Sequence, residues 1–419
     1  MIGGAAVLII VVGILLYVGL RPKPPSATAV TLTVWGTEDK VAIGAALASY
    51  PYGKVSYVQV DPASYESKLL SALAAGTGPD MFEIKNSDVP KWKSVIVPLP
   101  TSSLLFNLLA LQQYFPDVVA QDFYVGGQLY GLPLSIDTLA MVYNKDLLNS
   151  AGIATLPATW DAFDADVAQL RTVNAQGQLT RAAAAIGGSL ASVTNAPDLL
   201  SLLMLQNGTA MTSDEKTMAT FAEQGGGNGT AGNDAFNFYL QFASAASPYY
   251  TWNDAMENDV DSFVAGKTAI IFAYQSDLAA IKAKAPFINM GVAPVPQAKG
   301  ASVAVNYPSY EGFVVAKAGQ PSAAWSLIFY LTTTPGVAAQ YQTASGKPPA
   351  LRTAIQALAN DPNLSVFARQ ALTARSWYEA DSAQIDSIFD AAIRNVLSGA
   401  TDSTTALKGA EAAVTQIMR

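Results

Sequence analysis

The chain of 419 residues is 51% hydrophobic and only 13% charged, a composition that is typical of globular proteins and unlike that of disordered chains. Its net charge of −8 and its lack of basic runs argue against nucleic-acid binding. Because the sequence contains neither Cys nor His, disulfides, thiolate nucleophiles and the commonest metal ligands are excluded, and we expect no metal and no cofactor.

The first 20 residues carry no charged side chain and are long enough to cross a bilayer as a helix. We therefore expect residues 1–20 to form a transmembrane anchor, followed by a stiff, proline-rich linker over residues 21–29. A cleaved signal peptide is the alternative, but it would have a shorter apolar core and a small-residue cleavage site. The positive charges follow this segment, so the positive-inside rule places the body in the cytoplasm unless a basic extension precedes Met1.

Strands and helices are predicted to alternate after the linker. Alternation of apolar and polar residues predicts the strands, and apolar stripes between capping residues predict the helices. The elements predicted first are strands over 30–35, 54–60 and 80–84 and helices over 40–50 and 62–75. This βαβαβ order predicts a parallel sheet with right-handed crossovers. Ligands bind beyond the carboxyl ends of the strands in such sheets, where the sequence places residues 35–39 and 85–86.

The middle of the chain continues this mixture, and the last third is almost entirely helical. Strands are predicted over 138–143, 267–273, 289–295 and 312–316. Helices are predicted over 145–151, 198–206, 234–243, 254–265 and 277–284, and after Thr159, Pro321, Pro335 and Pro362. Apolar stripes over 385–396 and 407–417 predict the last two helices. The pattern and the length predict an α/β protein of two or three units.

Four blocks of sequence carry a family resemblance. The most specific block runs from Tyr130 to Phe163 and contains the segments YGLP, YNKDL and TWDAF. The other blocks are 65–82, which contains AGTGPD, 263–270 and 397–418. Taken in this order, the blocks resemble the extracellular solute-binding proteins of family 1, the group that is similar to maltose-binding protein. The resemblance covers the chain from residue 30 to its end.

The resemblance implies a type II periplasmic-binding-protein fold, in which two α/β lobes close on a ligand like a clam-shell. By analogy, lobe one comprises 30–135 and 294–318, and lobe two comprises 136–293 and 319–419. The resemblance also implies the substrate-binding subunit of an ABC importer, which captures a small solute, above all a carbohydrate, and delivers it to the permease subunits. We expect a monomer without enzymatic activity, anchored in the cell membrane with its body on the extracytoplasmic face.

The candidate ligand-binding residues fall at predicted strand ends, in crossovers between the lobes or in loops between helices. Aromatic candidates offer an apolar face to a sugar ring, and polar candidates exchange hydrogen bonds with its hydroxyl groups. The aromatic candidates are Trp35, Trp252, Tyr274, Tyr310 and Trp377, and the polar candidates are Thr37, Glu38, Asp39, Asn86, Asp137, Ser276 and Glu311. Core packing is the alternative for the tryptophans, and a solvated helix start is the alternative for Glu38 and Asp39.

One position departs from the family pattern. Many relatives carry Gly-x-Trp after the strand predicted over 267–273, and that Trp stacks on sugar, whereas this chain has Tyr274 and Ser276 there. Tyr274 is then the substitute aromatic, or the pocket holds a more polar solute. Acidic candidates such as Glu38 and Asp137 leave a cationic solute such as a polyamine as an alternative. A ligand-sensing ectodomain and a two-carboxylate glycoside hydrolase are alternatives from other classes.

Overall fold

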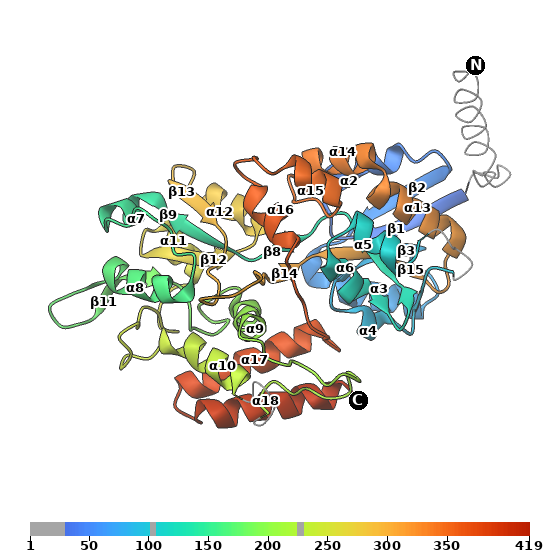
Figure 1. The fold of residues 1–419 in the computed structure, drawn as a ribbon. Helices are drawn as coiled ribbons and strands as arrows, with labels where there is room; N and C mark the ends of the chain where they lie inside the picture. The colour runs from blue at the N-terminus through green and yellow to red at the C-terminus, as the bar shows by residue number, and fades with distance from the viewer. Residues whose placement is uncertain (1–29, 101–105, 224–229) are drawn as a thin grey trace, which may run out of the picture.

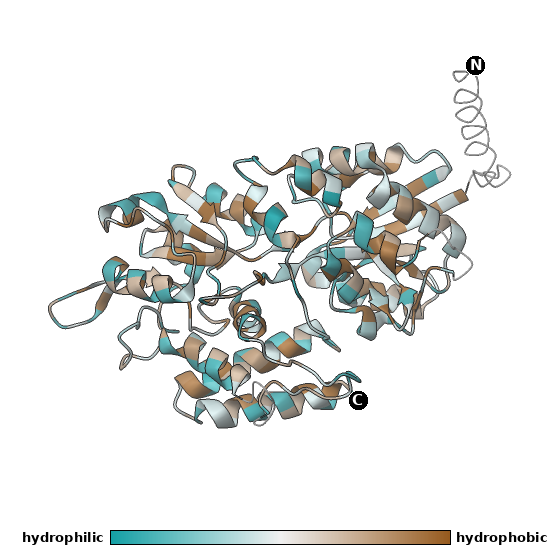
Figure 2. Ribbon diagram, in the orientation of Figure 1, coloured by the Kyte–Doolittle hydropathy of each residue, from teal (hydrophilic) through white to brown (hydrophobic). Residues whose placement is uncertain are grey.

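The computed structural model describes residues 30–100, 106–223 and 230–419, which form two α/β lobes side by side (Figure 1). Each lobe has its own sheet and its own hydrophobic core, and apolar residues are frequent on the strands of both sheets (Figure 2). The predicted two-lobed α/β architecture is therefore confirmed. The predicted anchor over 1–20 and linker over 21–29 lie outside the described residues. Among the described helices, none combines the length and the apolar character needed to cross a membrane.

The sheet of the first lobe is parallel in its first three strands, as predicted. In spatial order its strands are β2 (Gly53–Gln59), β1 (Val30–Gly36), β3 (Met81–Lys85), β15 (Glu311–Ala316) and β4 (Ile96–Val97), and β7 (Gly131–Pro133) also pairs with β15. β1 pairs in parallel with β2 and β3, whereas β15 returns from late in the chain and runs antiparallel to β3. The carboxyl ends of β1 and β3 therefore meet the start of β15 at one edge of the sheet.

Two helices of this lobe begin at aspartate caps. Asp39 accepts hydrogen bonds from the backbone N–H groups at the start of α2 (Lys40–Ala48), and Asp61 caps α3 (Pro62–Ala74). The smaller elements of the lobe are α4 (Val89–Trp92), α5 (Leu108–Tyr114), α6 (Asp117–Phe123) and the hairpin of β5 (Tyr124–Val125) and β6 (Gln128–Leu129). Side-chain acceptors at these N-termini satisfy amide donors that have no partner inside a helix.

The second lobe surrounds a five-stranded mixed sheet. In spatial order its strands are β10 (Thr172–Val173), β11 (Leu179–Ala184), β12 (Thr268–Ala273), β9 (Ala140–Asn144) and β13 (Met290–Ala293). Its helices are α7 (Lys145–Ser150), α8 (Trp160–Leu170), α9 (Ala196–Gln206), α10 (Ala231–Gln241), α11 (Asp259–Val264), α12 (Leu278–Lys284), α17 (Ser382–Leu397) and α18 (Ser403–Ile417). The helix predicted from residue 254 begins only at Asp259, because Asp254 accepts hydrogen bonds from Ser189 and Ser192 instead of capping a helix.

The late helices divide between the lobes differently from the predicted boundary. α13 (Pro321–Thr333), α14 (Pro335–Ser345) and α15 (Arg352–Ala357) contribute to the core of the first lobe, whereas residues 319–419 were all assigned to lobe two. α13 covers β15 and α14 packs against α2, so their apolar faces are buried on the first sheet. Of residues 319–419, Phe367 and the chain from about Trp377 onward, with α17 and α18, belong to the second core. Figure 1 shows these two red helices beneath the green and yellow lobe.

Three crossovers join the lobes within the described residues. Two of them contain the short strands β8 (Asp137–Thr138) and β14 (Pro308–Ser309), which pair antiparallel between the two sheets. The third follows α16 (Ser365–Ala371), which contacts β8 and adds residues to both cores. The helix predicted after Pro362 begins at Ser365, because Asp361 accepts from the N–H groups of Asn363 and Leu364 in a turn. Paired short strands between two rigid sheets are suited to act as a hinge.

Candidate ligand-binding site between the lobes

A cavity of about 200 Å³ lies between the lobes, close to the third crossover. Its walls come from the end of β3 and from α6 in lobe one, from the chain after α9 in lobe two, and from the crossover before α17. The residues that line it include Asn86, Asp122, Thr209, Lys216, Trp377 and Tyr378. Because both lobes supply walls, a hinge motion would change the size of this cavity.

Asp122 is the polar centre of the cavity wall in lobe one. Its Oδ2 accepts from Asn86 Nδ2 at 2.8 Å and from the Tyr310 hydroxyl at 2.6 Å, and its Oδ1 accepts from the Ser376 hydroxyl. Burial raises the pKa of Asp122 to about 6, although these three donors oppose the shift. Two predicted site residues, Asn86 and Tyr310, are thus brought together by a carboxylate that the sequence did not single out.

The wall from lobe two carries aromatic and cationic groups. Trp377 is only 5% exposed and stacks on Phe389 with ring centroids 6.1 Å apart. Its indole N–H and the Thr209 hydroxyl are buried and have no hydrogen-bond partner among the described residues. Lys216 lies over the Tyr378 ring at 5.4 Å and has a φ of 55°, an uncommon backbone conformation for a side-chain-bearing residue. Unpaired donors and such backbone conformations are features that cluster at binding sites.

The turn after β1 is held by internal contacts. Trp35 is partly buried against the first core, and Thr37 donates its backbone N–H to Glu83 Oε2 at 2.7 Å. Asp39 accepts from two backbone N–H groups at the start of α2, so its carboxylate acts as the helix cap that was its alternative role. Glu38 is 7% exposed and forms an ion pair with Lys347 at 2.7 Å.

Asp137 fastens the hinge to lobe two. Its two carboxylate oxygens accept from the backbone N–H groups of Gln275 and Ser276 at 3.0 and 2.9 Å, and Oδ1 also accepts from the N–H of Thr138. Burial raises the pKa of Asp137 to about 6, against the effect of these donors. The structure therefore gives Asp137 a positioning role: it fixes the loop after β12, on which Tyr274 and the exposed Ser276 lie.

Trp252 lies away from the inter-lobe cavity. It is fully buried in the core of lobe two, and its indole N–H donates to Ser192 Oγ at 3.0 Å. The structure thus places this candidate in the role of a core residue packed under a loop. Size and aromatic character alone did not distinguish it from Trp377, which also packs in the core but reaches the cavity wall.

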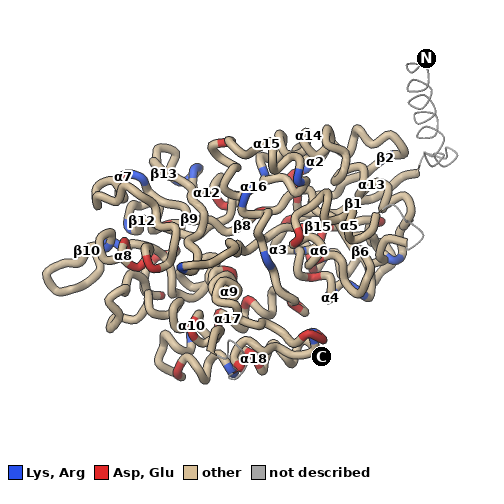
Figure 3. Tube along the Cα trace, viewed as in Figure 1, with Lys and Arg blue, Asp and Glu red and all other residues tan. Residues whose placement is uncertain are grey.

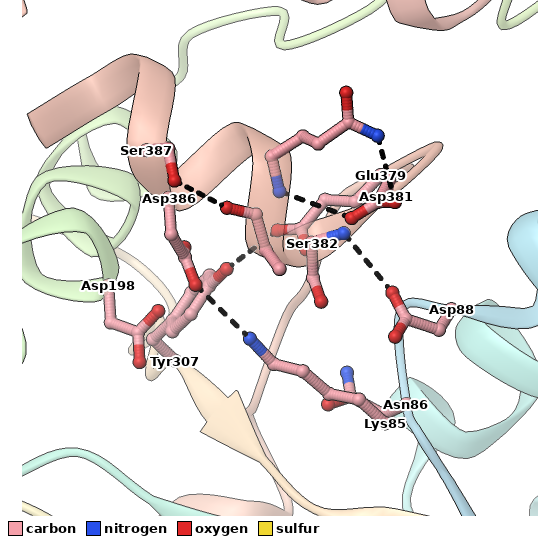
Figure 4. A network of polar contacts seen from close by, with 12 residues as sticks. Lys85, Asn86, Asp88, Asp198, Tyr307, Glu379, Asp381, Ser382, Asp386 and Ser387 are labelled. Atoms are coloured by element: carbon pink, nitrogen blue, oxygen red, sulfur yellow. Dashed lines mark hydrogen bonds and ion pairs between the residues drawn. The ribbon is translucent and has the colours of Figure 1, made fainter. Parts of the chain in front are cut away.

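Charged groups that the sequence did not single out join the two lobes (Figure 4). Lys85, the last residue of β3, lies 3.7 Å from Asp386 of α17, measured from Nζ to Oδ2. The N–H of Ser382, in the first turn of α17, donates to Asp88 Oδ1 at 3.1 Å. Burial alone would lower the pKa of Lys85, but the surrounding carboxylates, led by Asp198, raise it on balance.

Two tyrosines hold further carboxylates beside Lys85. The Tyr307 hydroxyl donates to Glu379 Oε1 at 2.9 Å, and the Tyr274 hydroxyl donates to Asp198 Oδ2 at 2.7 Å. Burial raises the pKa of Glu379 to about 7, while Lys85 opposes the shift. Tyr274 is only 6% exposed, so its hydroxyl orients a carboxylate while its ring is mostly covered.

A second group of charges lies at the carboxyl edge of the first sheet. Glu83 is buried, and the pKa of its carboxyl is raised well above the usual range by burial and by the neighbouring Glu38 and Glu311. Glu311 begins β15, and part of this residue is exposed. The protein around its carboxyl group nevertheless shields that group from water and raises its pKa as well. Lys347 is the cation of this group. Figure 3 shows residues of both signs along the trace near the junction of the lobes.

The arrangement favours binding of a polar small molecule. Carboxylate and amide acceptors, unpaired donors and aromatic rings converge where the lobes meet, as they do in sites that fix hydroxyl-bearing ligands. In the described ranges, no group of three or more His, Cys, Asp or Glu is arranged to hold a metal ion. The fold and this site define the class: a two-lobed α/β protein of the periplasmic-binding type.

The chain belongs to the bacterial extracellular solute-binding proteins, since residues 33–338 match the model of that family. A 50-residue segment is also 44% identical to a protein of Brucella abortus that is named only as a binding protein. That match covers 12% of this chain and 12% of the relative's length.

Among the solved structures with the same fold are proteins that bind sugars. The sugar-binding protein MalE of Xanthomonas citri is 22% identical with a TM-score of 0.76, and the match covers 93% of this chain and 97% of that one. A solute-binding protein of an ABC transporter from Thermotoga lettingae, bound with α-D-tagatose, is 20% identical with a TM-score of 0.71, covering 93% and 100%. A cyclic α-maltosyl-1,6-maltose binding protein of Arthrobacter globiformis is 20% identical with a TM-score of 0.72, covering 93% and 99%. At these identities the likeness establishes the fold.

Proposed function

We propose that this protein captures a sugar or oligosaccharide between its lobes and delivers it to the permease of an ABC importer. The observation that carries the proposal is the inter-lobe cavity, whose walls combine Trp377 and Tyr378 with the hydrogen-bonding groups of Asn86 and Asp122. An aromatic ring packs against the apolar face of a sugar, while amide and carboxylate groups bind its hydroxyls. The solved structures of the same fold, which bind sugars, support this ligand class.

Capture works through the hinge. A ligand shifts a protein toward its closed state only by binding that state more tightly than the open one. Here Asn86 and Asp122 belong to lobe one, and Trp377 and Lys216 belong to lobe two or its crossover, so a solute in the cavity touches both lobes only when they are together. A permease that recognises the closed form can then distinguish a loaded protein from an empty one.

The remaining parts of the proposal follow from the family. Members of an extracellular solute-binding family act outside the cytoplasm, which places the described body on the extracytoplasmic side. We propose that the body acts as a monomer and that an N-terminal anchor holds it at the membrane. The protein returns its solute unchanged, and the carboxylates of the cleft act as hydrogen-bond acceptors and not as a glycosidase pair.

The test is a thermal-shift screen of the full chain against monosaccharides and maltose-type, cellulose-type and mannose-type oligosaccharides. A ligand at about 100 times its dissociation constant adds roughly 2.7 kcal/mol to the folded state, which gives a clear rise in melting temperature. We expect one sugar class to give this rise, Tyr378→Ala to abolish it, and Tyr52→Ala, which removes an exposed tyrosine of lobe one, to leave it unchanged. A panel without any shift, or a sugar recovered hydrolysed, overturns the proposal.

A further inference from the structure

The charged groups of the cleft are strongly biased toward carboxylates. The Lys85 group consists of this lysine and the four carboxylates that act on it, which are Asp88, Asp198, Glu379 and Asp386. Figure 4 shows these side chains around Lys85, with Asp88 contributed by lobe one and the other three by lobe two. The single ammonium group of Lys85 therefore faces four carboxylates at the point where the lobes touch.

The Lys347 group, at the edge of the first sheet, also contains more carboxylates than lysines. Its carboxylates are Glu38, Glu83 and Glu311, and only Glu38 forms an ion pair with Lys347, at 2.7 Å. The groups adjoin each other, because Glu311 on β15 lies directly opposite Lys85 on β3 and diagonal to Glu83. The two groups together contain seven carboxyl groups and two lysines, and most of these carboxyl groups are buried; this set is called the acidic cluster.

One buried carboxyl oxygen of this cluster lacks a hydrogen-bond partner. Glu83 is only 2% exposed; its Oε2 accepts from Thr37, but its Oε1 has no hydrogen-bond partner among the described residues. The carboxylate lies against Gly36, where any side chain would sit 2.5 Å from the Glu83 carboxyl carbon, so the backbone leaves room for this group. A buried polar atom without a partner is costly unless a ligand or a water supplies one.

We propose that the solute carries at least one protonated primary amine, which binds the acidic cluster where Glu83 and Glu311 adjoin; this inference rests on the proposed binding function and names its substrate class. An alkylammonium group donates three hydrogen bonds and brings the positive charge that the two lysines do not supply. A neutral hydroxyl can form a hydrogen bond with Glu83 but brings no positive charge to the cluster. An amino sugar and a polyamine both carry this chemistry.

The test compares ligands that carry a protonated amine with ligands that do not. Isothermal titration calorimetry on the full chain would use the disaccharide of β-1,4-linked glucosamine, its N-acetylated counterpart, maltose and spermidine. We expect the glucosamine disaccharide to bind at least about tenfold more tightly than the N-acetylated one, a factor equivalent to about 1.4 kcal/mol. Tight binding of spermidine without any sugar upholds the amine and overturns the sugar.

Other outcomes separate the two proposals. Binding of maltose or of the N-acetylated disaccharide, equal to or tighter than that of the amine, overturns the amine and leaves the proposed sugar-binding function intact. Binding of none of the four overturns the amine as well. We expect Glu311→Gln to weaken binding of the amine at least about tenfold and to weaken binding of a neutral sugar by a smaller factor. Glu257→Gln, which removes an exposed carboxylate paired with Lys267 in lobe two, is the matched control and should change neither.

Discussion

Asp122 allows the electrostatics of the cavity to be tested directly. Its carboxylate accepts three side-chain hydrogen bonds, yet burial raises its pKa to about 6. An aspartate in an unfolded chain has a pKa of about 3.9, so the native state holds this proton over about two more pH units. Asp122→Asn keeps the shape of the side chain and removes its titration.

The sign of the effect follows from proton binding. Between the unfolded and folded pKa values, the native state holds a proton at Asp122 that the unfolded chain has lost. The resulting stabilisation is fully present below about pH 4 and is lost as the pH rises through about 6. A shift of about two pH units corresponds to roughly 2.7 kcal/mol. The variant loses a fixed amount of about 1–3 kcal/mol in its free energy of unfolding, because a hydrogen bond is disrupted. The difference in this free energy between the native protein and the variant should nevertheless shrink by up to about 2.7 kcal/mol from pH 4 to pH 7.

Urea unfolding followed by tryptophan fluorescence, repeated across this pH range, measures the difference. The other buried carboxylates titrate in both proteins, so the difference between variant and native chain isolates Asp122. Asp214→Asn, which alters an exposed aspartate, is the control and should give no pH-dependent difference. A deficit of Asp122→Asn that stays constant with pH, or that grows as the pH rises, refutes the reasoning.

Three further changes test the packing and charges around the cleft. Gly36→Ala places a methyl group 2.5 Å from the Glu83 carboxyl carbon and should cost about 1–3 kcal/mol in urea unfolding, part of which Glu83→Ala should restore. Trp252→Ala should cost about 3–5 kcal/mol because the ring is fully buried, yet at a temperature where the variant is folded its ligand affinity should match that of the native chain. Lys85→Met should lower the free energy of unfolding by about 1–2 kcal/mol near pH 8 and by less near pH 5. The reason is that Glu379, with a pKa of about 7, is protonated at the lower pH and no longer needs a cation. Equal losses at both pH values would contradict this.

Much of the fold was predictable because its signals are local. Asp39 and Asp61 cap helices from adjacent positions, and strands such as β1 carry their alternation within a few residues. Asp254 shows where local reasoning fails: it has the chemistry of a helix cap, but its carboxylate is taken up by serines about 60 residues earlier in the chain. The lobe boundary after residue 318 failed similarly, since only contacts with β1, β15 and α2 reveal where α13 and α14 pack.

The candidate site was predictable only in its framework. Asn86, predicted at a strand end, and Trp377, predicted in a loop between helices, both line the cavity. The partners that give these residues their electrostatics come from distant positions: Asp122 lies 36 residues from Asn86, and Lys347 lies 309 residues from Glu38. No spacing rule relates positions that are brought together only by two lobes packing against each other.

Both lobes contribute carboxylates to the cleft, and this distribution links the proposed cationic solute to the proposed hinge closure. Lobe one contributes Asp88 and the carboxylates of the Lys347 group, and lobe two contributes Asp198, Glu379 and Asp386. Closing an empty cleft brings these like charges together, and Lys85 offsets them only in part. A cationic solute removes that repulsion in the closed state and has little effect in an open one, so its charge adds directly to the differential affinity that drives closure. A neutral sugar lacks this contribution and would have to close the lobes through stacking and hydrogen bonds alone.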